Sequence, residues 1–594
     1  MTEGAQDSFL GVERSLTGKR WVLRDADDRM VLALAQQRGI PEPLARTLVS
    51  RGIDVAKAET FLEPTLRSLL PDPHCLQDMA VGAERLAAAV MSAERVCIFA
   101  DYDVDGATSA AVLRKFLSAA DLDVQIYVPD RITEGYGPSA DALVQLKRSG
   151  VSLIVTVDCG ISAHDALAAA RDVDLDVIVV DHHKAGATLP PALAVINPNR
   201  LDDDSGLGHL AAVGVSFLLA VAVNRGLREA GWYTARGEPD LMDVLDLVAL
   251  GTVCDMVPLQ DLNRAFAKQG LKVMARRSNR GLTALADLCG LDGPPSASDL
   301  GFQIGPRINA GGRVGKAHYG ACLLTSNDPV EIDRLTHALD QYNSERKAIE
   351  HAVVEDAILG LVRRDEPGEM PFVWAEGEQW HPGVLGIAAS RLVERFNRPA
   401  FVVAVTGETA TCSSRSTPGF DMGAAIGAAK DAGLLLKGGG HIMAAGFTAE
   451  RARLDDVKSF FAKRLARLCD DDFMIPRLTV DSLLFPTGVS PVLATVFKRA
   501  EPFGIGNPAP RFAICNVFVR AVSGFGQNHL RCRLRDQDGS AFDAVAFRMA
   551  DTLLGRTLSK HDGQPFHVAG RLSLRCWNGN ERASLIIEDA AVAL

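Results

Sequence analysis

The sequence lacks the features that mark secreted and membrane proteins. Its 11 cysteines are scattered and no Cys-X-X-Cys pair occurs, so neither a disulfide framework nor a zinc site is indicated. The longest apolar run, residues 210–223, has 14 residues and contains Gly214 and Ser216, which makes it too short to span a membrane. The first residues, MTEGAQDSFLGVERS, contain neither the basic nor the apolar region of a secretory signal. We therefore expect a cytoplasmic protein that does not associate with a membrane.

The sequence also lacks an overall positive charge. The net charge is −11, which by itself argues against a nucleic-acid partner. However, residues 477–594 contain 14 Lys and Arg against 10 Asp and Glu, a net of +4, which leaves −15 for the remainder. This asymmetry is typical of an acidic catalytic part joined to a basic binding part. A chain of 594 residues is too long for one hydrophobic core, so roughly three to five domains are expected.

A short apolar run that ends in three carboxylates is present near residue 100. Residues 96–106, VCIFADYDVDG, place Asp101, Asp103 and Asp105 between a β-branched run and an Ala-rich segment, which predicts a strand, a turn and a helix. In open α/β sheets the carboxyl ends of the strands face the ligand crevice, so these acids are well placed for metal or phosphate chemistry. From this motif alone, an acidic surface turn remains the alternative.

Three further apolar runs end in similar side chains. LIVTV precedes Asp158, VIVV precedes the tripeptide Asp181-His182-His183, and LDLVALGTV, which we interpret as another strand, ends near Asp255. If the four strand ends converge, so many carboxylates cannot all stay ionised unless cations neutralise them. Oxygen ligands with imidazole and without thiolate favour Mg²⁺ or Mn²⁺. Two such ions form the catalytic centre of many enzymes that hydrolyse phosphodiesters by in-line attack, so we predict phosphoester hydrolysis.

The predicted fold class is α/β. Short apolar strands that alternate with helices between residues 95 and 180 predict a parallel sheet covered on both faces. A helical pattern over residues 329–364 predicts one long connecting helix, although two shorter helices divided near Gly360 remain possible. A second α/β unit follows, and five strands of alternating polarity between residues 513 and 588 predict a small C-terminal β-barrel.

The motifs in combination resemble those of the DHH phosphoesterase family. ADYDVDG, VTVDCG, VVDHH and GTVCDMVPL match its four motifs, and within the family the chain is similar to the single-strand-specific 5′-to-3′ DNA exonucleases. The further stretches that carry this resemblance are GPRINAGGR at 305–313, NSERK at 343–347, HPGVLG at 381–386, SSRS at 413–416, GGGH at 438–441 and EPFGIGNP at 501–508. The similarity runs from about residue 55 to the end of the chain.

The resemblance implies a domain order. We expect an N-terminal helical segment at 1–80, a DHH phosphoesterase domain at 81–265, a helical connector with the long helix at 266–365, a DHH-associated domain at 366–450, a helical linker at 451–476 and a nucleic-acid-binding OB-fold at 477–594. An OB-fold would guide single-stranded DNA through a basic groove with base stacking. Candidate stacking residues are Phe503, Phe512, Phe525 and Trp577, with a buried core position as the alternative for each.

The resemblance also implies roles for individual residues. The implied ligands of two Mn²⁺ or Mg²⁺ ions are Asp103, Asp105, Asp158, His182 and Asp255. Asp101 and Asp181 would support them, and His183 would lie close to the scissile phosphate. The predicted catalytic set is Asp101, Asp103, Asp105, Asp158, His182, His183 and Asp255. The strand's phosphates would be held by Arg307, Asn309, Arg313, Ser413, Arg415, Gly439, Gly440 and His441, and in this family a pocket for the 5′ phosphate sets the polarity.

The expected function is 5′-to-3′ hydrolysis of single-stranded DNA to 5′-mononucleotides, in DNA repair and recombination. One alternative is a DHH phosphodiesterase of short oligonucleotides or cyclic dinucleotides, but such enzymes are usually shorter and lack the barrel. The other is a non-catalytic DNA-binding relative, which would have lost ligands that are all present here. The expected partners are single-stranded DNA, a single-strand-binding protein and repair factors, and the expected state is a monomer.

Overall fold

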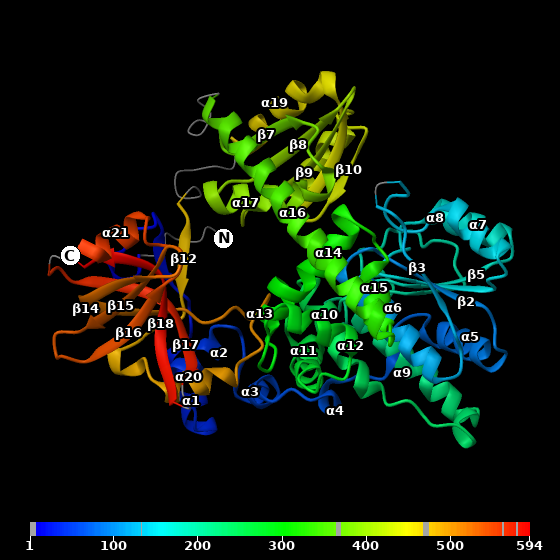
Figure 1. Cartoon of the computed structure of the whole chain (residues 1–594), viewed down its shortest axis with the longest axis horizontal. Helices are drawn as coiled ribbons and strands as arrows, with labels where there is room; N and C mark the ends of the chain where they lie inside the picture. Colours follow the sequence, from blue (N-terminus) through cyan, green and yellow to red (C-terminus); the bar gives the residue numbers. More distant parts are fainter. Residues whose placement is uncertain are drawn as a thin grey trace. The chain divides into compact units, whose positions relative to one another are not determined.

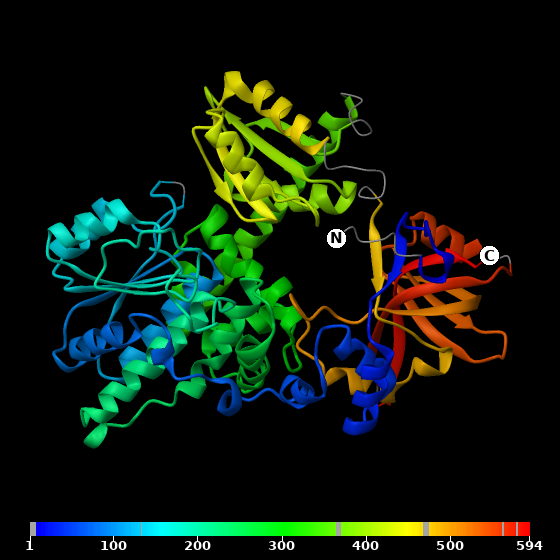
Figure 2. The same cartoon turned by 180° about the vertical axis from the view of Figure 1, so that it is seen from behind.

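The structure is a computed structural model that describes residues 8–131, 133–363, 370–466, 475–560, 563–577 and 580–593. It divides into two compact units, which are described separately. The parallel-sheet unit comprises Ala56–Glu345 and Arg499–Ala509, and the barrel unit comprises Met1–Val55, Arg346–Lys498 and Pro510–Leu594. Figures 1 and 2 show the chain from opposite sides.

The parallel-sheet unit is built on five strands. They are β2 (Val96–Ala100), β3 (Gln125–Tyr127), β4 (Leu153–Val157), β5 (Asp176–Val180) and β6 (Ala194–Ile196). The strand order is β3-β2-β4-β5-β6, and every pairing is parallel. All residues of β2 and β4 are buried, as expected for a sheet covered on both faces, because neither face of such strands meets water. The predicted parallel sheet is therefore confirmed.

Helices cover both faces of this sheet (Figure 1). On one face the core consists of α5 (Met79–Met91), α6 (Val104–Ala119) and α9 (Ala212–Glu229), packed against strand residues such as Ile98 and Val155. On the other face α7 (Ala140–Arg148) and α8 (His164–Asp172) pack against Cys97 and Ile154. Alternate residues of each strand thus enter two separate cores. This arrangement leaves the strand ends as the place where polar side chains can gather.

The run that ends at Asp255 is a helix, which corrects our prediction of a fourth strand. Residues Leu245–Cys254 form α10, and Asp255 is its C-cap residue. The helix is apolar on all sides because α6, α9 and α11 (Asp261–Met274) enclose it. A short apolar run fits a buried strand and a buried helix equally well, and the mixture of Leu, Ala and Gly with Val and Thr in this one does not separate the two. Asp255 therefore reaches the site from a helix end.

The rest of this unit is helical. It contains α12 (Arg280–Leu288), α13 (Ala297–Asp299), the π-helix η5 (Leu300–Ile304), α14 (Gly305–Val314) and α15 (Tyr319–Thr325). The helix α16 (Pro329–Arg363) has 35 residues and begins in this unit, which confirms one continuous long helix rather than two. Short 3₁₀ segments elsewhere are η1 (Phe9–Gly11), η2 (Pro73–Cys75), η3 (Trp232–Thr234), η4 (Leu241–Val244), η6 (Pro382–Val384), η7 (Arg451–Arg453) and η8 (Pro486–Gly488).

A buried arginine holds a distant segment of the chain in the parallel-sheet unit. Arg264 of α11 is 1% exposed and donates hydrogen bonds to the carbonyl oxygens of Phe61 (2.6 Å), Ala500 (2.8 Å), Glu501 (2.9 Å) and Pro502 (3.2 Å). Its guanidinium also lies 3.9 Å from the centre of the Phe61 ring. Residues 499–509, which include the whole motif EPFGIGNP at 501–508, therefore belong structurally to this unit.

The barrel unit contains a second α/β layer. Its sheet has the order β10-β11-β9-β8-β7, with β7 (Val373–Glu378), β8 (Ala400–Thr406), β9 (Thr409–Arg415), β10 (Lys437–Gly440) and β11 (Ala444–Glu450). The pair β7 and β8 is parallel, and the other pairs are antiparallel. The helices are α17 (Leu385–Phe396), α18 (Met422–Asp431) and α19 (Leu454–Leu465). The predicted second α/β unit is thus confirmed.

The C-terminal part contains a closed five-stranded barrel. Its strands are β14 (Phe512–Phe525), β15 (His529–Arg535), β16 (Ala541–Ala546), β17 (Phe566–Trp577) and β18 (Asn580–Val592). The order β14-β15-β16-β18-β17 closes through a β14–β17 pairing, as predicted. The short strand β13 (Ser482–Leu483) pairs with β14, and the helices α20 (Pro491–Lys498) and α21 (Leu553–Lys560) accompany the barrel.

The N-terminal segment is not purely helical. The helices α1 (Asp28–Arg38), α2 (Glu42–Val49), α3 (Val55–Leu62) and α4 (Leu66–Leu69) agree with the prediction, but β1 (Arg20–Leu23) pairs in parallel with β12 (Arg477–Val480). The fully buried Trp21 donates from its indole nitrogen to Asp589 at 2.8 Å. Sequence patterns missed this strand because its partner lies more than 450 residues away. Residues 467–474 of the predicted linker are outside the described part, and our domain boundaries stay predictions.

Candidate active site

The turn after β2 is held in a fixed conformation. Asp103 is the N-cap of α6, and its carboxylate accepts hydrogen bonds from the backbone nitrogens of Asp105 (2.8 Å) and Gly106 (3.1 Å). Position 106 must be glycine, because a Cβ atom there would lie 2.4 Å from the carbonyl oxygen of Asp101. The three acids of this turn therefore have little freedom to move apart.

Asp105 is fixed by the N-terminus of a second helix. Its carboxylate is buried and accepts hydrogen bonds from the backbone nitrogens of Ala212 (2.6 Å) and Val213 (2.9 Å), the first two residues of α9. Burial, together with the negative charge of Asp103, raises the pKa of Asp105 to about 7, and the two backbone hydrogen bonds oppose that rise. The helix N-terminus thus orients a carboxylate that would otherwise be costly to keep ionised.

Asp158 and His182 bring the next two strand ends together. Asp158 follows β4 in the left-handed conformation, with φ of 59°, which is strained for a non-glycine residue and is typical of functional sites. Nε2 of His182 lies 3.4 Å from Oδ1 of Asp158, 3.6 Å from Oδ2 of Asp255 and 3.9 Å from Oδ2 of Asp105. Nδ1 of His182 lies 3.0 Å from the carbonyl oxygen of Leu210. Since a carbonyl can only accept, Nδ1 carries the proton and Nε2 presents its lone pair to the three carboxylates.

Asp181 is the partner of His183. Its buried carboxylate accepts from Nδ1 of His183 (2.7 Å) and from the backbone nitrogens of His182 (2.7 Å), His183 (3.1 Å) and Ile161 (3.1 Å). Burial alone would raise the pKa of Asp181, but the hydrogen bonds and charge of His183 lower it. Burial alone would lower the pKa of His183, but Asp181 raises it. Each group thus favours the charged form of the other, and these contacts fit the supporting role predicted for Asp181.

Several buried polar atoms of the cluster have no hydrogen-bond partner among the described residues. They are Oδ1 of Asp101, Oδ1 of Asp158, Nε2 of His182 and Oδ2 of Asp255. Burial and the neighbouring negative charges raise the pKa of Asp158 and Asp255 well above the usual range. Burial lowers the pKa of His182 to about 4, so its ring is neutral and able to act as a ligand. Unpaired buried acceptors are costly, and cations would relieve that cost.

The donor set fits divalent metal ions. Three triads have ligand atoms within 4.8 Å of one another: Asp105, His182 and Asp255; Asp101, Asp103 and Asp158; and Asp158, His182 and His183. Carboxylate oxygens with one or two imidazole nitrogens suit Mn²⁺ or Mg²⁺. The structure therefore brings all seven predicted catalytic residues into one cluster, including the five predicted metal ligands, and the division of these ligands between ions stays a prediction.

The predicted phosphate-binding residues of α14 lie in the same unit. Oδ1 of Asn309 accepts from the backbone nitrogen of Val104 at 3.2 Å, so this side chain supports the acidic turn. Arg307 donates to Asp340 (2.9 Å) and to the carbonyl oxygen of Gln303 (2.8 Å). A phosphate at Arg307 would therefore compete with Asp340. Arg313, at the end of α14, is half-buried.

The other predicted phosphate-binding residues lie together in the barrel unit. Ser413 and Arg415 are on β9, and the neighbouring strand β11 separates them from β10, which carries Gly439 and Gly440. His441 follows β10 directly. Arg415 is half-buried, its Nη1 donates to the carbonyl oxygen of Ser414 at 2.9 Å, and desolvation lowers its pKa. These five residues thus gather at one end of the second sheet, and their role stays a prediction.

Sequence analysis missed two groups of residues that hold His182 and His183. Tyr136 donates to the carbonyl oxygen of Asp158 at 3.0 Å and lies 3.4 Å from Nδ1 of His183. Asn199 donates to the carbonyl oxygen of His182 at 2.6 Å, and Asn197 donates to that of His183 at 2.9 Å. Both asparagines follow β6 at the same sheet end as the acids. We interpreted Asn-Pro-Asn as a turn only, although its place after an apolar run could have revealed it.

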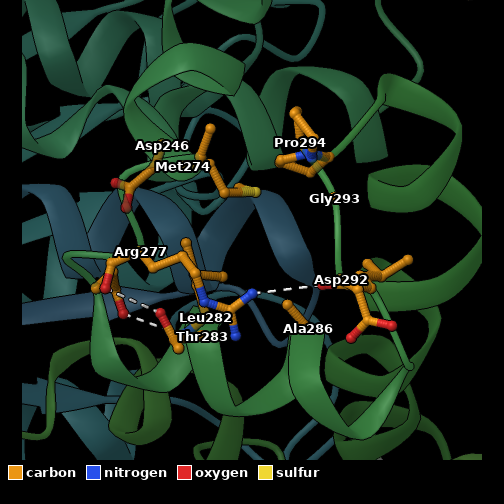
Figure 3. A pocket seen from close by; sticks show the side chains of 13 residues that line it. Asp246, Met274, Arg277, Leu282, Thr283, Ala286, Asp292, Gly293 and Pro294 are labelled. Atoms are coloured by element: carbon orange, nitrogen blue, oxygen red, sulfur yellow. Dashed lines mark hydrogen bonds between the residues drawn. The ribbon is translucent and has the colours of Figure 1, made fainter. Parts of the chain in front are cut away.

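A separate cavity of about 200 Å³ lies between α11, α12 and the loop after α12. Figure 3 shows Arg277 among the side chains that line it, and Nη1 of Arg277 donates to the carbonyl oxygen of Leu291 at 3.4 Å. Its lining includes Asp246 of the first turn of α10 but none of the clustered acids. Asp246 and Asp255 are at opposite ends of the same helix, so this cavity is distinct from the candidate metal centre.

The fold and the cluster define the class of protein. Residues 95–252 match the model of the DHH family N-terminal domain, residues 369–467 match the DHHA1 domain, and residues 480–589 match the RecJ OB domain. A parallel sheet whose strand ends carry the DHH tripeptide and clustered carboxylates is thus that of a DHH-class, metal-dependent phosphoesterase. No helix in the described part of the chain is long and apolar enough to cross a membrane.

Relatives identify the family. The chain is 34% identical to the single-stranded-DNA-specific exonuclease RecJ of Bacillus subtilis, over 97% of this chain and 71% of the relative. It is 35% identical to that of Salmonella typhimurium, over 95% of this chain and 98% of the relative. The chain belongs to the RecJ family. The crystal structure of RecJ from Thermus thermophilus in complex with Mn²⁺ matches with a TM-score of 0.79 and 29% identity, over 96% of this chain and 79% of that one. The complex of the same protein with Mg²⁺ matches with a TM-score of 0.73 and 28% identity, over 96% and 78% of the two chains.

Proposed function

We propose that this chain is an exodeoxyribonuclease that hydrolyses single-stranded DNA from the 5′ end and releases 5′-mononucleotides. One observation carries the proposal: Asp158, His182 and Asp255 present unpartnered buried atoms toward one point, in a chain of the RecJ family. Its relatives are named single-stranded-DNA-specific exonucleases. Repair and recombination are the processes in which such an activity would act.

The metal centre would be held by Asp103, Asp105, Asp158, His182 and Asp255. Two bound Mn²⁺ or Mg²⁺ ions supply positive charge and lower the pKa of bound water. The chain's own contribution is orientation. Leu210, just before α9, fixes the ring of His182, and the first two residues of α9 fix the carboxylate of Asp105, so that two of the ligands need no rearrangement when a cation binds.

His183 would stabilise charge on the phosphate. Its Nδ1 proton is held by Asp181, and this pairing favours the imidazolium form. The His183 side chain is 37% exposed, whereas the Asp181 carboxylate is fully buried, so His183 is the member of the pair that a substrate can reach. A cation beside the scissile phosphate stabilises the negative charge that develops in the transition state. Asp181 is a positioning residue that acts through His183.

The barrel offers surfaces suited to a single strand. The guanidinium of Arg531 lies 5.4 Å from the centre of the Phe525 ring, and that of Arg575 lies 5.7 Å from the centre of the Phe547 ring. Arginines beside half-exposed aromatic rings are typical of stacking sites for nucleobases. Of the other candidate stacking residues, Phe512 is fully buried in the core, Phe503 is half-buried in the parallel-sheet unit, and the Trp577 side chain is outside the described residues.

The phosphate contacts and the polarity form a second part of the proposal. We assign the strand's phosphates to Arg307, Asn309, Arg313, Ser413, Arg415, Gly439, Gly440 and His441, and we further propose a pocket for the 5′ phosphate that sets the polarity. Arginine side chains are suited to phosphate because they bind it bidentately. Glycine-rich backbone is suited to phosphate because a phosphate can approach it closely. We further propose a single-strand-binding protein as partner, a monomeric state and a cytoplasmic location. The residue ranges of the six domains given above are also part of the proposal.

Labelled substrates test this function directly. Single strands and duplexes labelled at the 5′ or the 3′ end are incubated with the protein and Mn²⁺. We expect a 5′-labelled single strand to release labelled mononucleotide from the first turnover, a 3′-labelled strand to shorten without early release of label, and the duplex to resist. Absence of mononucleotide from both single strands would overturn the proposal, and early release from the 3′ end would overturn the polarity.

A further inference from the structure

Phe302 has an unusually exposed ring for a residue on a helix that is otherwise packed. It is 81% exposed, whereas Leu300 and Ile304, two positions away on either side, are fully buried. All three belong to the π-helix η5. Single exposed apolar side chains are common on protein surfaces, so the position of Phe302 decides whether it carries a function. π-helical turns inserted between α-helices occur frequently at functional sites.

The π-helix lies directly against the helix that delivers Asp255. The Sγ atom of Cys254 lies 3.5 Å from the carbonyl oxygen of Leu300, and a Cβ atom on Gly301 would lie 3.8 Å from Cγ1 of Val253. Both contacts are with the last turn of α10, and Asp255 follows as its C-cap. Phe302 therefore projects into solvent from a segment that borders the metal centre.

The residue after Asp255 has the same unusual character. Met256 is 66% exposed and has a φ of 60°, which is strained for a residue with a Cβ atom. Met256, directly after Asp255, and Phe302, on the segment that packs against the last turn of α10, thus each expose an apolar side chain. Their place next to the segment that carries Asp255 therefore gives these two exposed side chains a candidate role in binding.

We propose that the Phe302 ring is a stacking platform for a nucleobase of the single strand close to the metal centre, with Met256 as a neighbouring apolar contact. This inference rests on the proposed function, because the strand's scissile phosphate must lie at the clustered acids. The same helical run continues into α14, which carries Arg307 and Arg313 further along. A strand with phosphates near those arginines has its bases free to turn toward Phe302. Every base has an apolar π-face, so the platform accepts any sequence.

The test compares Phe302 variants on strands with and without bases. F302A removes the ring, F302L keeps an apolar side chain without a π-face, and F302W restores stacking. V330A, which removes an apolar side chain that is 77% exposed on α16 in the same unit, is the matched control. On an ordinary single strand we expect F302A and F302L to raise KM about 10-fold, which corresponds to about 1.4 kcal/mol, with kcat within about twofold, because only the stacking of one base is lost. F302W and V330A should match the unsubstituted protein.

An abasic strand separates stacking from a structural role. On a strand whose first nucleotides lack bases, F302A and the unsubstituted protein should have equal KM values, because neither has a base to stack. A 2-aminopurine walked along the 5′ region should be quenched on binding to the unsubstituted protein at one position and not to F302A. Equal KM on ordinary strands, or an equal loss on ordinary and abasic strands, would overturn the stacking role. If the unsubstituted protein cleaves no single strand, the proposed function itself fails, which is a distinct result.

Discussion

Nδ1 of His182 donates a hydrogen bond to the carbonyl oxygen of Leu210 at 3.0 Å. Two residues later the backbone nitrogens of Ala212 and Val213 bind both oxygens of Asp105. One short segment at the start of α9, residues 210–213, therefore fixes the tautomer of an imidazole and the orientation of a carboxylate in the same cluster. A histidine and an aspartate do not adopt this geometry by themselves. Their common support at the start of α9 holds both side chains in place for a divalent ion.

The imidazole of His182 is expected to be essential for activity. H182A removes the lone pair that faces three carboxylates, so we expect exonuclease activity with Mn²⁺ to fall at least about 100-fold. The matched control is H337A on α16, because that side chain is 70% exposed and lies outside the motifs. Activity of H182A within about threefold of the unsubstituted protein would exclude His182 as a ligand.

Metal ions are expected to stabilise the folded protein. The clustered carboxylates have unpartnered buried oxygens, so cations that bind only the folded state should raise Tm as their concentration exceeds Kd. We expect Mn²⁺ to raise Tm by several degrees at about 100 times Kd, which corresponds to about 2.7 kcal/mol, and EDTA to reverse the rise and to abolish activity. An unchanged Tm with Mn²⁺ would contradict a preformed metal centre.

The buried carboxylate of Asp246 destabilises the folded protein by an amount that depends on pH. Burial raises its pKa from the ordinary 3.8 to about 6, so the folded state binds this proton more tightly than the unfolded state does. The cost is fully present above about pH 6 and is relieved as the pH falls from 6 toward 4. D246N should therefore stabilise the protein by about 2 kcal/mol at pH 8 and by much less at pH 4.5, as measured by chemical denaturation. A stabilisation that is the same at both pH values would show that titration of Asp246 is not the cause.

Arg264 is expected to contribute strongly to stability. Its buried guanidinium binds four backbone carbonyl oxygens, so R264A leaves these acceptors unpaired and should destabilise the protein by about 3–5 kcal/mol in urea unfolding. R228A breaks an ion pair with Glu238 at the surface and should change stability by less than about 1 kcal/mol. A loss with R264A no larger than that with R228A would contradict the structural role.

The contacts of Arg264 also affect the outcome of deleting the C-terminal barrel. Deletion of residues 477–594 would take away Ala500, Glu501 and Pro502, and so would leave a buried guanidinium without three of its acceptors. We therefore expect this deletion to lower stability as well as binding to long strands. Supplying residues 499–509 through a short linker should restore thermal stability and the cleavage of dinucleotides, but not tight binding of long strands.

Sequence patterns located most of the site because its chemistry lies at strand ends. Asp101, Asp158 and Asp181 each follow a short buried run, and such runs were predicted with boundaries within a few residues of β2, β4 and β5. Asp255 was assigned to the correct cluster but to the wrong element, since a ten-residue apolar run has no period that separates helix from strand. The five-stranded barrel followed from its alternating polarity.

Contacts between residues that are distant in the sequence could not be predicted from the sequence. The pairing of β1 with β12, the bond between His182 and Leu210, and the competition of Asp340 for Arg307 depend on the tertiary fold. Hydrophobic period identifies which face of an element is buried, but it does not identify the partner of a polar atom. The exposed ring of Phe302 is invisible to sequence patterns for the same reason.

The most direct test combines metal binding and catalysis at Asp158. Titration of Mn²⁺ by calorimetry and the release of 5′-mononucleotides from a single strand are measured on the same preparations of the unsubstituted protein and D158A. We expect two Mn²⁺ per unsubstituted chain, fewer in D158A, and a loss of activity of at least about 100-fold in D158A. Full activity of D158A, or a metal content unchanged by the substitution, would contradict a two-metal phosphodiesterase centre at these strand ends.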